Sequence, residues 1–198
     1  MLSFLKNELS SLKNHTKTLD KKVVIIFLSV AVLQTISWYI TSRQFFRTNI
    51  FEQYQFHSQV YLIEYLYWFI GDFITFFILP VFIIRLVLKE KLSDYGLRIG
   101  DYKTGLKITL VFILIMLPLV WFASSSDSFA NVYPHLPAAR ESWTIFLIYE
   151  LGLLVYMIAW EFIWRGYMLF GLYEKFGIYS LFIQMIPCLL YTSPSPRD

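Results

Sequence analysis

Charged residues, glycine, proline and cysteine are all scarce in this sequence of 198 residues. Only 16% of the residues are charged, whereas soluble domains carry about 25%. With 8 Gly and 7 Pro, the chain is neither disordered nor collagen-like in composition. The single cysteine, Cys188, offers neither a disulfide nor a cysteine metal cluster. A net charge of +3, spread among apolar blocks, excludes nucleic acid as the expected partner.

Long uncharged runs dominate what remains, since 57% of the residues are hydrophobic. The run between Lys22 and Arg43 holds about 20 residues, the length that a membrane-spanning helix needs. It is too long for the core of a signal peptide, and no small-residue cleavage site follows it. Further apolar blocks cover Tyr65–Ile84, Ile108–Ser126, a stretch from Trp143 and a shorter stretch from Phe176. The sequence therefore predicts an all-α, polytopic membrane helical bundle with four transmembrane helices plus a truncated fifth.

Lys and Arg are unevenly shared among the segments that connect these blocks. They gather before the first block and between the second and third: Lys6, Lys13, Lys17, Lys21, Lys22, Arg85, Lys89, Lys91, Arg98, Lys103 and Lys107. Because positive residues accumulate on the cytoplasmic side, we expect a multi-pass protein of the cell (plasma) membrane with a cytoplasmic N-terminus. We divide the chain into a cytoplasmic segment (1–22), a transmembrane domain (23–187) and a tail (188–198).

Four ionisable residues interrupt the apolar blocks, and such residues are costly in a membrane and mark candidate functional sites. They are Asp72, Glu150, Glu161 and Arg165. At 100° per residue, Glu150 and Glu161 lie about 20° apart around a helix and Arg165 lies about 40° further. We expect these three to share one stripe that faces the bundle interior. The pair Glu161–Arg165 is either functional or a structural ion pair, whereas Asp72 and Glu150 are interpreted as polar contacts between helices.

The run Ala159-Trp160-Glu161-Phe162-Ile163-Trp164-Arg165-Gly166 resembles the first motif of the CPBP intramembrane proteases, the CAAX-prenyl-endopeptidase and bacteriocin-processing (Abi) family. That motif is commonly E-E-x-x-x-R-G. Glu161, Arg165 and Gly166 match its second Glu, its Arg and its Gly, while Trp160 stands where its first Glu is usual. The segment from Lys91 to Lys107 resembles the family's connecting loop. The resemblance covers residues 85–187.

This resemblance implies an intramembrane endopeptidase that hydrolyses a peptide bond of a membrane-associated peptide or protein substrate within the lipid bilayer. Glu161 would activate the attacking water, Arg165 would hold and orient its carboxylate, and Glu150, Gly166 and Asp72 would support the site. The family's second motif, F-x-x-x-H, supplies a histidine from a later helix. No cofactor is assigned, because one Glu without histidine does not make a zinc site. A divalent metal such as zinc is expected only in a longer form that carries this histidine.

No such histidine follows in this sequence, which continues from Pro187 as CLLYTSPSPRD. These letters are what a transposase-type sequencing adapter encodes when it is translated. We therefore expect residues 188–198 to be a non-native tail and the chain to be a fragment, inactive as written. Two other functions stay open: a non-catalytic membrane protein, such as a bacteriocin self-immunity factor or scaffold, and a transporter fragment that relays protons through Asp72, Glu150 and Glu161.

Overall fold

The computed structural model describes residues 20–126, 129, 132, 133 and 135–192. Within this part of the chain the regular elements are all helices. Four of them are long and apolar enough to cross a membrane: Lys21–Thr41, Val60–Leu88, Tyr102–Ser124 and Trp143–Phe176. This confirms the expected all-α bundle with four spans, and the chain is a multi-pass membrane protein. Most of the predicted N-terminal segment (1–19) and the end of the predicted tail (193–198) lie outside the described residues.

Three of the four spans change between α and π geometry along their length. The first consists of α2 (Lys21–Ile36) and η1 (Ser37–Thr41), the second of α5 (Val60–Phe73), η2 (Ile74–Ile78), α6 (Leu79–Phe82) and η3 (Ile83–Leu88), and the fourth of α9 (Trp143–Glu161), η6 (Phe162–Met168) and α10 (Leu169–Phe176). The third span is the single helix α7 (Tyr102–Ser124). Shorter helices are α3 (Arg43–Asn49), α4 (Phe51–Tyr54), η4 (Leu92–Tyr95), η5 (Pro137–Arg140) and α11 (Tyr179–Thr192).

Polar residues at the ends of the apolar blocks set where several helices begin. Asp20 accepts hydrogen bonds from the backbone N–H groups of α2, and Ser142 caps α9 through the N–H of Ile145. Asp101 caps α7 in the same way, and the hydrogen bonds from Thr104 lower the pKa of its carboxyl. Such caps satisfy backbone donors that have no partner inside the helix.

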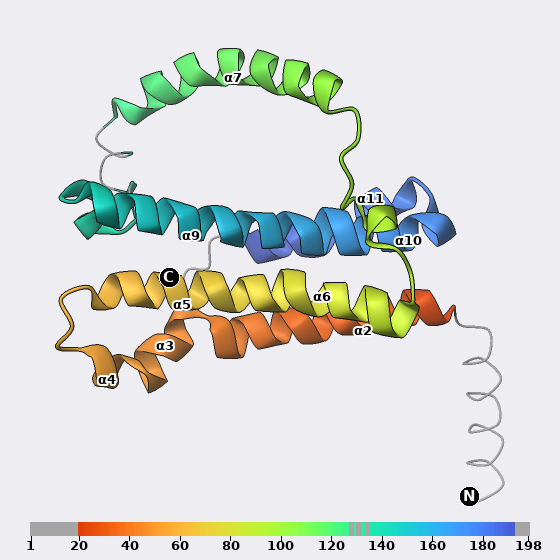
Figure 1. Ribbon diagram of the computed structural model, residues 1–198, viewed down its shortest axis with the longest axis horizontal. Coiled ribbons are helices and arrows are strands. Elements are labelled where there is room, and N and C mark those ends of the chain that lie inside the picture. The colour runs from red at the N-terminus through yellow and green to blue at the C-terminus, as the bar shows by residue number, and fades with distance from the viewer. Residues whose placement is uncertain (1–19, 127–128, 130–131, 134, 193–198) are drawn as a thin grey trace, which may run out of the picture.

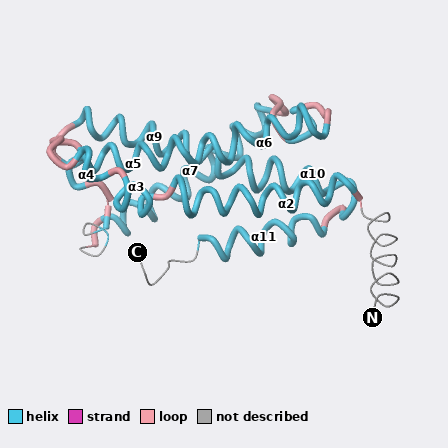
Figure 2. The backbone as a smooth tube through the Cα atoms, turned by 90° about the horizontal axis from the view of Figure 1, so that it is seen from below, coloured by secondary structure: helices cyan, strands magenta, loops and turns pink. Residues whose placement is uncertain are grey.

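The first, second and fourth spans pack side by side as a bundle (Figure 1). Helices α5 and α9 form its most extensive contact, with rings of Tyr65, Phe69 and Tyr149 packed between them. Toward the other end, side chains of α2 and η6 meet in a second cluster around Ile26, Trp164 and other apolar residues. Helix α11 follows α10 and runs back along the bundle (Figure 2).

Helix α7 stands apart from this bundle and arches over α9 (Figure 1). None of its residues is buried against the rest of the protein. The connection that leads into it begins with the turn η4, which ends at Gly96 with φ of +84°. The sequence predicts a compact turn here, with glycine at a positive φ, and both features are confirmed.

Candidate functional site

Glu161 and Arg165 lie at the point where the fourth span changes from α to π geometry. Glu161 is the last residue of α9, and Arg165 lies in the middle of η6. Arg165 Nη1 donates a hydrogen bond to Glu161 Oε2, so the two side chains form the ion pair that their spacing predicts.

The expectation that this pair faces the bundle interior is wrong. The side chains of Glu161 and Arg165 are 54% and 56% exposed. The buried face of the helix is instead taken by Ala159, by Phe162–Trp164 and by Gly166–Met168. The 100° periodicity places Glu150 and Glu161 on one side of α9 but does not decide whether another helix covers that side. Helix α7, none of whose residues is buried, does not pack over Glu161.

The ion pair lines a shallow groove of about 500 Å³, which we call the Glu161 groove. Most of its wall is apolar and comes from α9 and η6, with contributions from the second span and α10: Phe77, Leu154, Met157, Ile158, Phe162 and Phe170. The turn from Tyr95 to Leu97 closes one side, and Gly166 lies in the groove as well. A carboxylate and a guanidinium are thus held together in mostly apolar surroundings.

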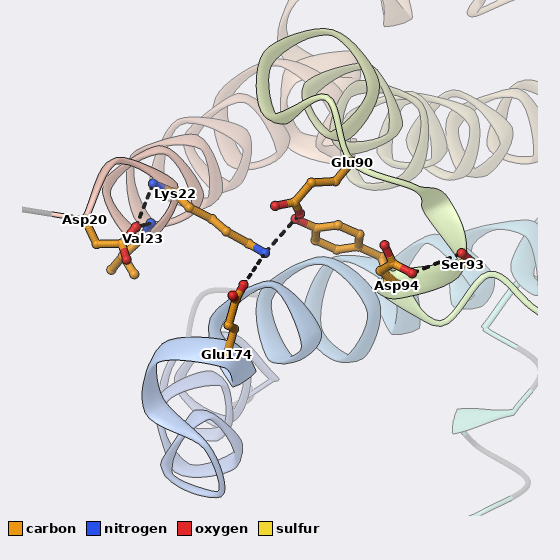
Figure 3. A network of polar contacts seen from close by, with 8 residues as sticks. Asp20, Lys22, Val23, Glu90, Ser93, Asp94 and Glu174 are labelled. Atoms are coloured by element: carbon orange, nitrogen blue, oxygen red, sulfur yellow. Dashed lines mark hydrogen bonds and ion pairs between the residues drawn. The ribbon is translucent and has the colours of Figure 1, made fainter.

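A network of polar and charged side chains holds the turn from Tyr95 to Leu97, which closes one side of the groove, in place. Lys22 Nζ lies 3.0 Å from Glu90 Oε2 and 3.5 Å from Glu174 Oε2, so it joins the first span to the ends of the second and fourth (Figure 3). Tyr95 donates a hydrogen bond of 2.5 Å to the same oxygen of Glu90. Burial, with a further contribution from this hydrogen bond, raises the pKa of the Tyr95 phenol. We call Lys22, Glu90, Tyr95 and Glu174 the Lys22 network.

Asp72 lies away from the groove, in a contact between the first and second spans. Its side chain is 1% exposed and accepts hydrogen bonds from Ser37 Oγ at 2.8 Å, Thr41 Oγ1 at 2.5 Å and Trp68 Nε1 at 2.8 Å. Three donors around one carboxylate stabilise the contact between η1 and α5. This geometry gives Asp72 a structural role and no access to a substrate in the Glu161 groove.

Glu150 is half-buried on α9 and does not line the Glu161 groove. In the described part of the chain it takes part in no ion pair. Among the same residues, no three His, Cys, Asp or Glu side chains come together as a metal site would require. The groove itself provides one carboxylate and no histidine, which does not fit a zinc site.

Comparison of the chain with protein-family models, with curated proteins and with solved structures finds no match.

A second charged cluster, not predicted from the sequence, lies at the opposite end of the bundle. Glu64 of α5 is fully buried and forms ion pairs with Arg43 and Arg47 of α3. The sequence predicts an apolar block that begins at Tyr65, but the helix already begins at Val60. The sequence does contain a signal for this cluster. A carboxylate adjoins an apolar block and lies close in sequence to a pair of arginines.

Proposed function

We propose that Glu161 and Arg165 form the carboxylate half of an intramembrane endopeptidase site of the CPBP type. The substrate class is a peptide or protein segment associated with the membrane. The observation that carries the proposal is the ion pair itself, placed in an otherwise apolar groove with Gly166 beside it. Placing a charged pair inside a transmembrane helix costs free energy, so its presence there supports a functional role.

In this proposal the carboxylate of Glu161 accepts a proton from a water molecule, whose oxygen attacks the carbonyl carbon of the scissile peptide bond. The protonated Glu161 then returns the proton to the leaving amine. Arg165 orients the carboxylate through the ion pair, and is a positioning residue. The apolar wall of the groove accommodates an apolar substrate segment.

The histidine of the family's second motif is not supplied by this chain, in which no histidine follows His135. The second candidate is a membrane protein, such as a bacteriocin self-immunity factor or scaffold, that keeps the fold without the chemistry. A proton relay through Asp72, Glu150 and Glu161 gains no support, because Asp72 and Glu150 do not line the Glu161 groove.

We also propose that the N-terminus and the Lys22 network lie on the cytoplasmic side of the plasma membrane. The Lys and Arg residues gathered before the first span and between the second and third spans support this orientation. Topology reporters test this orientation: a reporter fused after Arg98 is expected on the cytoplasmic side, and one fused after Ser126 on the opposite side.

The proposed reaction is tested on the protein encoded by the gene recovered through both of its ends. That protein is reconstituted in liposomes with fluorogenic membrane peptides, and wild type is compared with Glu161→Gln and Arg165→Gln. Loss of the base is expected to lower turnover by about 10²-fold or more. The charge-matched control is Glu141→Gln, because Glu141 is exposed and lies before α9.

Equal turnover of Glu161→Gln and wild type would show that Glu161 is not the base. If the wild type cleaves none of the peptides but protects cells against a membrane-active peptide, the non-catalytic function is the correct one.

A further inference from the structure

Two arginines of the short helix α3 converge on one carboxylate of α5. Arg43 Nε donates a hydrogen bond of 2.6 Å to Glu64 Oε1, and Arg47 Nε lies 2.9 Å from the same oxygen. The Arg43 guanidinium also lies over the ring of Tyr65, 4.0 Å from its centroid. The Glu64 side chain is 0% exposed, so it holds the two guanidiniums at a fixed place on the bundle.

The cluster has more positive charge than Glu64 neutralises and more hydrogen-bond donors than Glu64 can accept from. Two guanidiniums face one carboxylate, which leaves a net charge of one positive unit. Each guanidinium has five N–H donors, and within the described residues only Arg43 Nε forms a hydrogen bond. The side chains of Arg43 and Arg47 are 31% and 56% exposed, so the remaining donors are open to an outside acceptor.

The position along the spans places this cluster at the level of lipid headgroups. The first span has 21 residues, from Lys21 to Thr41, which at 1.5 Å per residue is close to the ~30 Å thickness of the hydrocarbon core. Arg43 follows two residues later, and Glu64 lies in the first turns of the second span. Helices α3 and α4 occupy this end of the bundle, while α10 lies at the other (Figure 1).

We propose that Arg43, Arg47 and Glu64 form a binding site for a phosphate-bearing anion at this membrane surface. The planar guanidinium matches the geometry of phosphate oxygens and binds them with paired hydrogen bonds. Glu64 keeps the two arginines together before the anion arrives, and the anion neutralises the charge that Glu64 leaves. A phospholipid headgroup and a free phosphate present the same chemistry, and the experiment separates them.

The full chain is purified in dodecyl maltoside, a detergent without phosphate, and its unfolding temperature is measured during three separate titrations. The additions are phosphatidylglycerol, a digalactosyl lipid that has no phosphate, and inorganic phosphate. We expect phosphatidylglycerol to raise the unfolding temperature in a saturable manner and the galactolipid to have no such effect. A rise with inorganic phosphate as well identifies a free anion as a ligand, and no rise with it identifies the lipid. If neither phosphate compound has an effect, the proposal is wrong.

Variants separate a binding site from a purely structural ion-pair cluster. Arg47→Gln keeps the Arg43–Glu64 pair and is expected to weaken phosphatidylglycerol binding about fivefold. Arg98→Gln, the matched control, removes an exposed arginine from the connection before α7 and is expected to bind as wild type does. Glu64→Gln removes the negative charge but keeps an oxygen that can accept hydrogen bonds from both guanidiniums, so a folded Glu64→Gln protein is expected to bind the lipid at least as tightly as wild type.

Equal lipid binding by Arg47→Gln and Arg98→Gln would overturn the proposal. Loss of lipid binding in a folded Glu64→Gln protein would do the same. If Glu64→Gln fails to fold, the comparison of Arg47→Gln with Arg98→Gln still tests the binding site, because both variants keep the buried carboxylate paired with Arg43.

Discussion

The Cα of Gly166 lies directly against the backbone of Tyr95, so that a Cβ at position 166 would be 3.1 Å from the Tyr95 carbonyl oxygen. The same Cβ would be 2.5 Å from Cδ2 of Phe162. This close approach joins η6, which carries Arg165, to the turn that closes the Glu161 groove. Close packing therefore explains why glycine stands at this position of the motif, independently of any catalytic role.

Gly166→Ala is expected to destabilise the protein by about 1–3 kcal/mol, because neither the backbone carbonyl nor the Phe162 ring can move away without disturbing the core. The matched control is Gly105→Ala, since a Cβ at Gly105 meets nothing within 4 Å. Gly105→Ala is expected to leave stability unchanged or raise it by up to ~1 kcal/mol. Denaturant unfolding in mixed micelles measures both. Equal stability of the two variants would contradict this packing.

Asp72→Ala is expected to destabilise the protein by about 3 kcal/mol. The substitution leaves the donors of Ser37, Thr41 and Trp68 without their shared acceptor in a buried place. Asp94→Ala is the control, because Asp94 is exposed and, among the described residues, its carboxylate accepts a hydrogen bond only from its neighbour Ser93. The unfolding temperatures of both variants in detergent provide the measurement. A small and equal effect of the two substitutions would show that the buried contact contributes little.

Tyr95 is expected to make stability depend on alkaline pH. Its phenol pKa is raised in the folded protein by burial and by the hydrogen bond to Glu90. The contribution is therefore complete below the ordinary tyrosine pKa of about 10 and falls as the pH rises above it. Between pH 9 and pH 11, wild type should lose more stability than Tyr95→Phe. The exposed Tyr173 provides the control variant Tyr173→Phe, and a loss in Tyr95→Phe as large as in wild type would refute the assignment.

The ion pair of Glu161 and Arg165 is expected to contribute little to folding, because both side chains are more than half exposed. Glu161→Gln and Arg165→Gln should each change the free energy of unfolding by less than ~1 kcal/mol. A double-mutant cycle on the two positions, measured by denaturant unfolding, gives the coupling energy directly. A coupling well above ~1 kcal/mol would make the pair structural and weaken the case for a site.

Much of the architecture could be predicted because length and hydropathy decide which segments cross a bilayer. The uncharged run after Lys22 and the block that contains Asp72 both became spans, and Gly96 adopted the positive φ expected of the turn. The second span extended past its predicted start at Tyr65, because Glu64 is neutralised by arginines that lie before it in the chain. Hydropathy alone does not predict the ion pairs between Glu64 and these arginines.

The candidate site was predicted in part. Helical spacing was sufficient to predict the Glu161–Arg165 ion pair, since residues four apart are neighbours on the surface of an α-helix. Spacing was not sufficient to predict that the pair is exposed, because it does not show which helix covers that side of α9, and α7 leaves it uncovered. It also did not predict the Lys22 network, whose members lie far apart in the sequence.

The scarcity of charge and the long uncharged runs determined by themselves that this protein is a helical membrane protein, because a bilayer accepts few other structures. The family resemblance likewise rests on a contiguous motif around Glu161. Only the tertiary structure decided which donors bind Asp72, that Glu64 forms ion pairs with Arg43 and Arg47, and that the Tyr95 turn lines the Glu161 groove. These relationships depend on which helix faces which, and that is set by packing between segments distant in the chain.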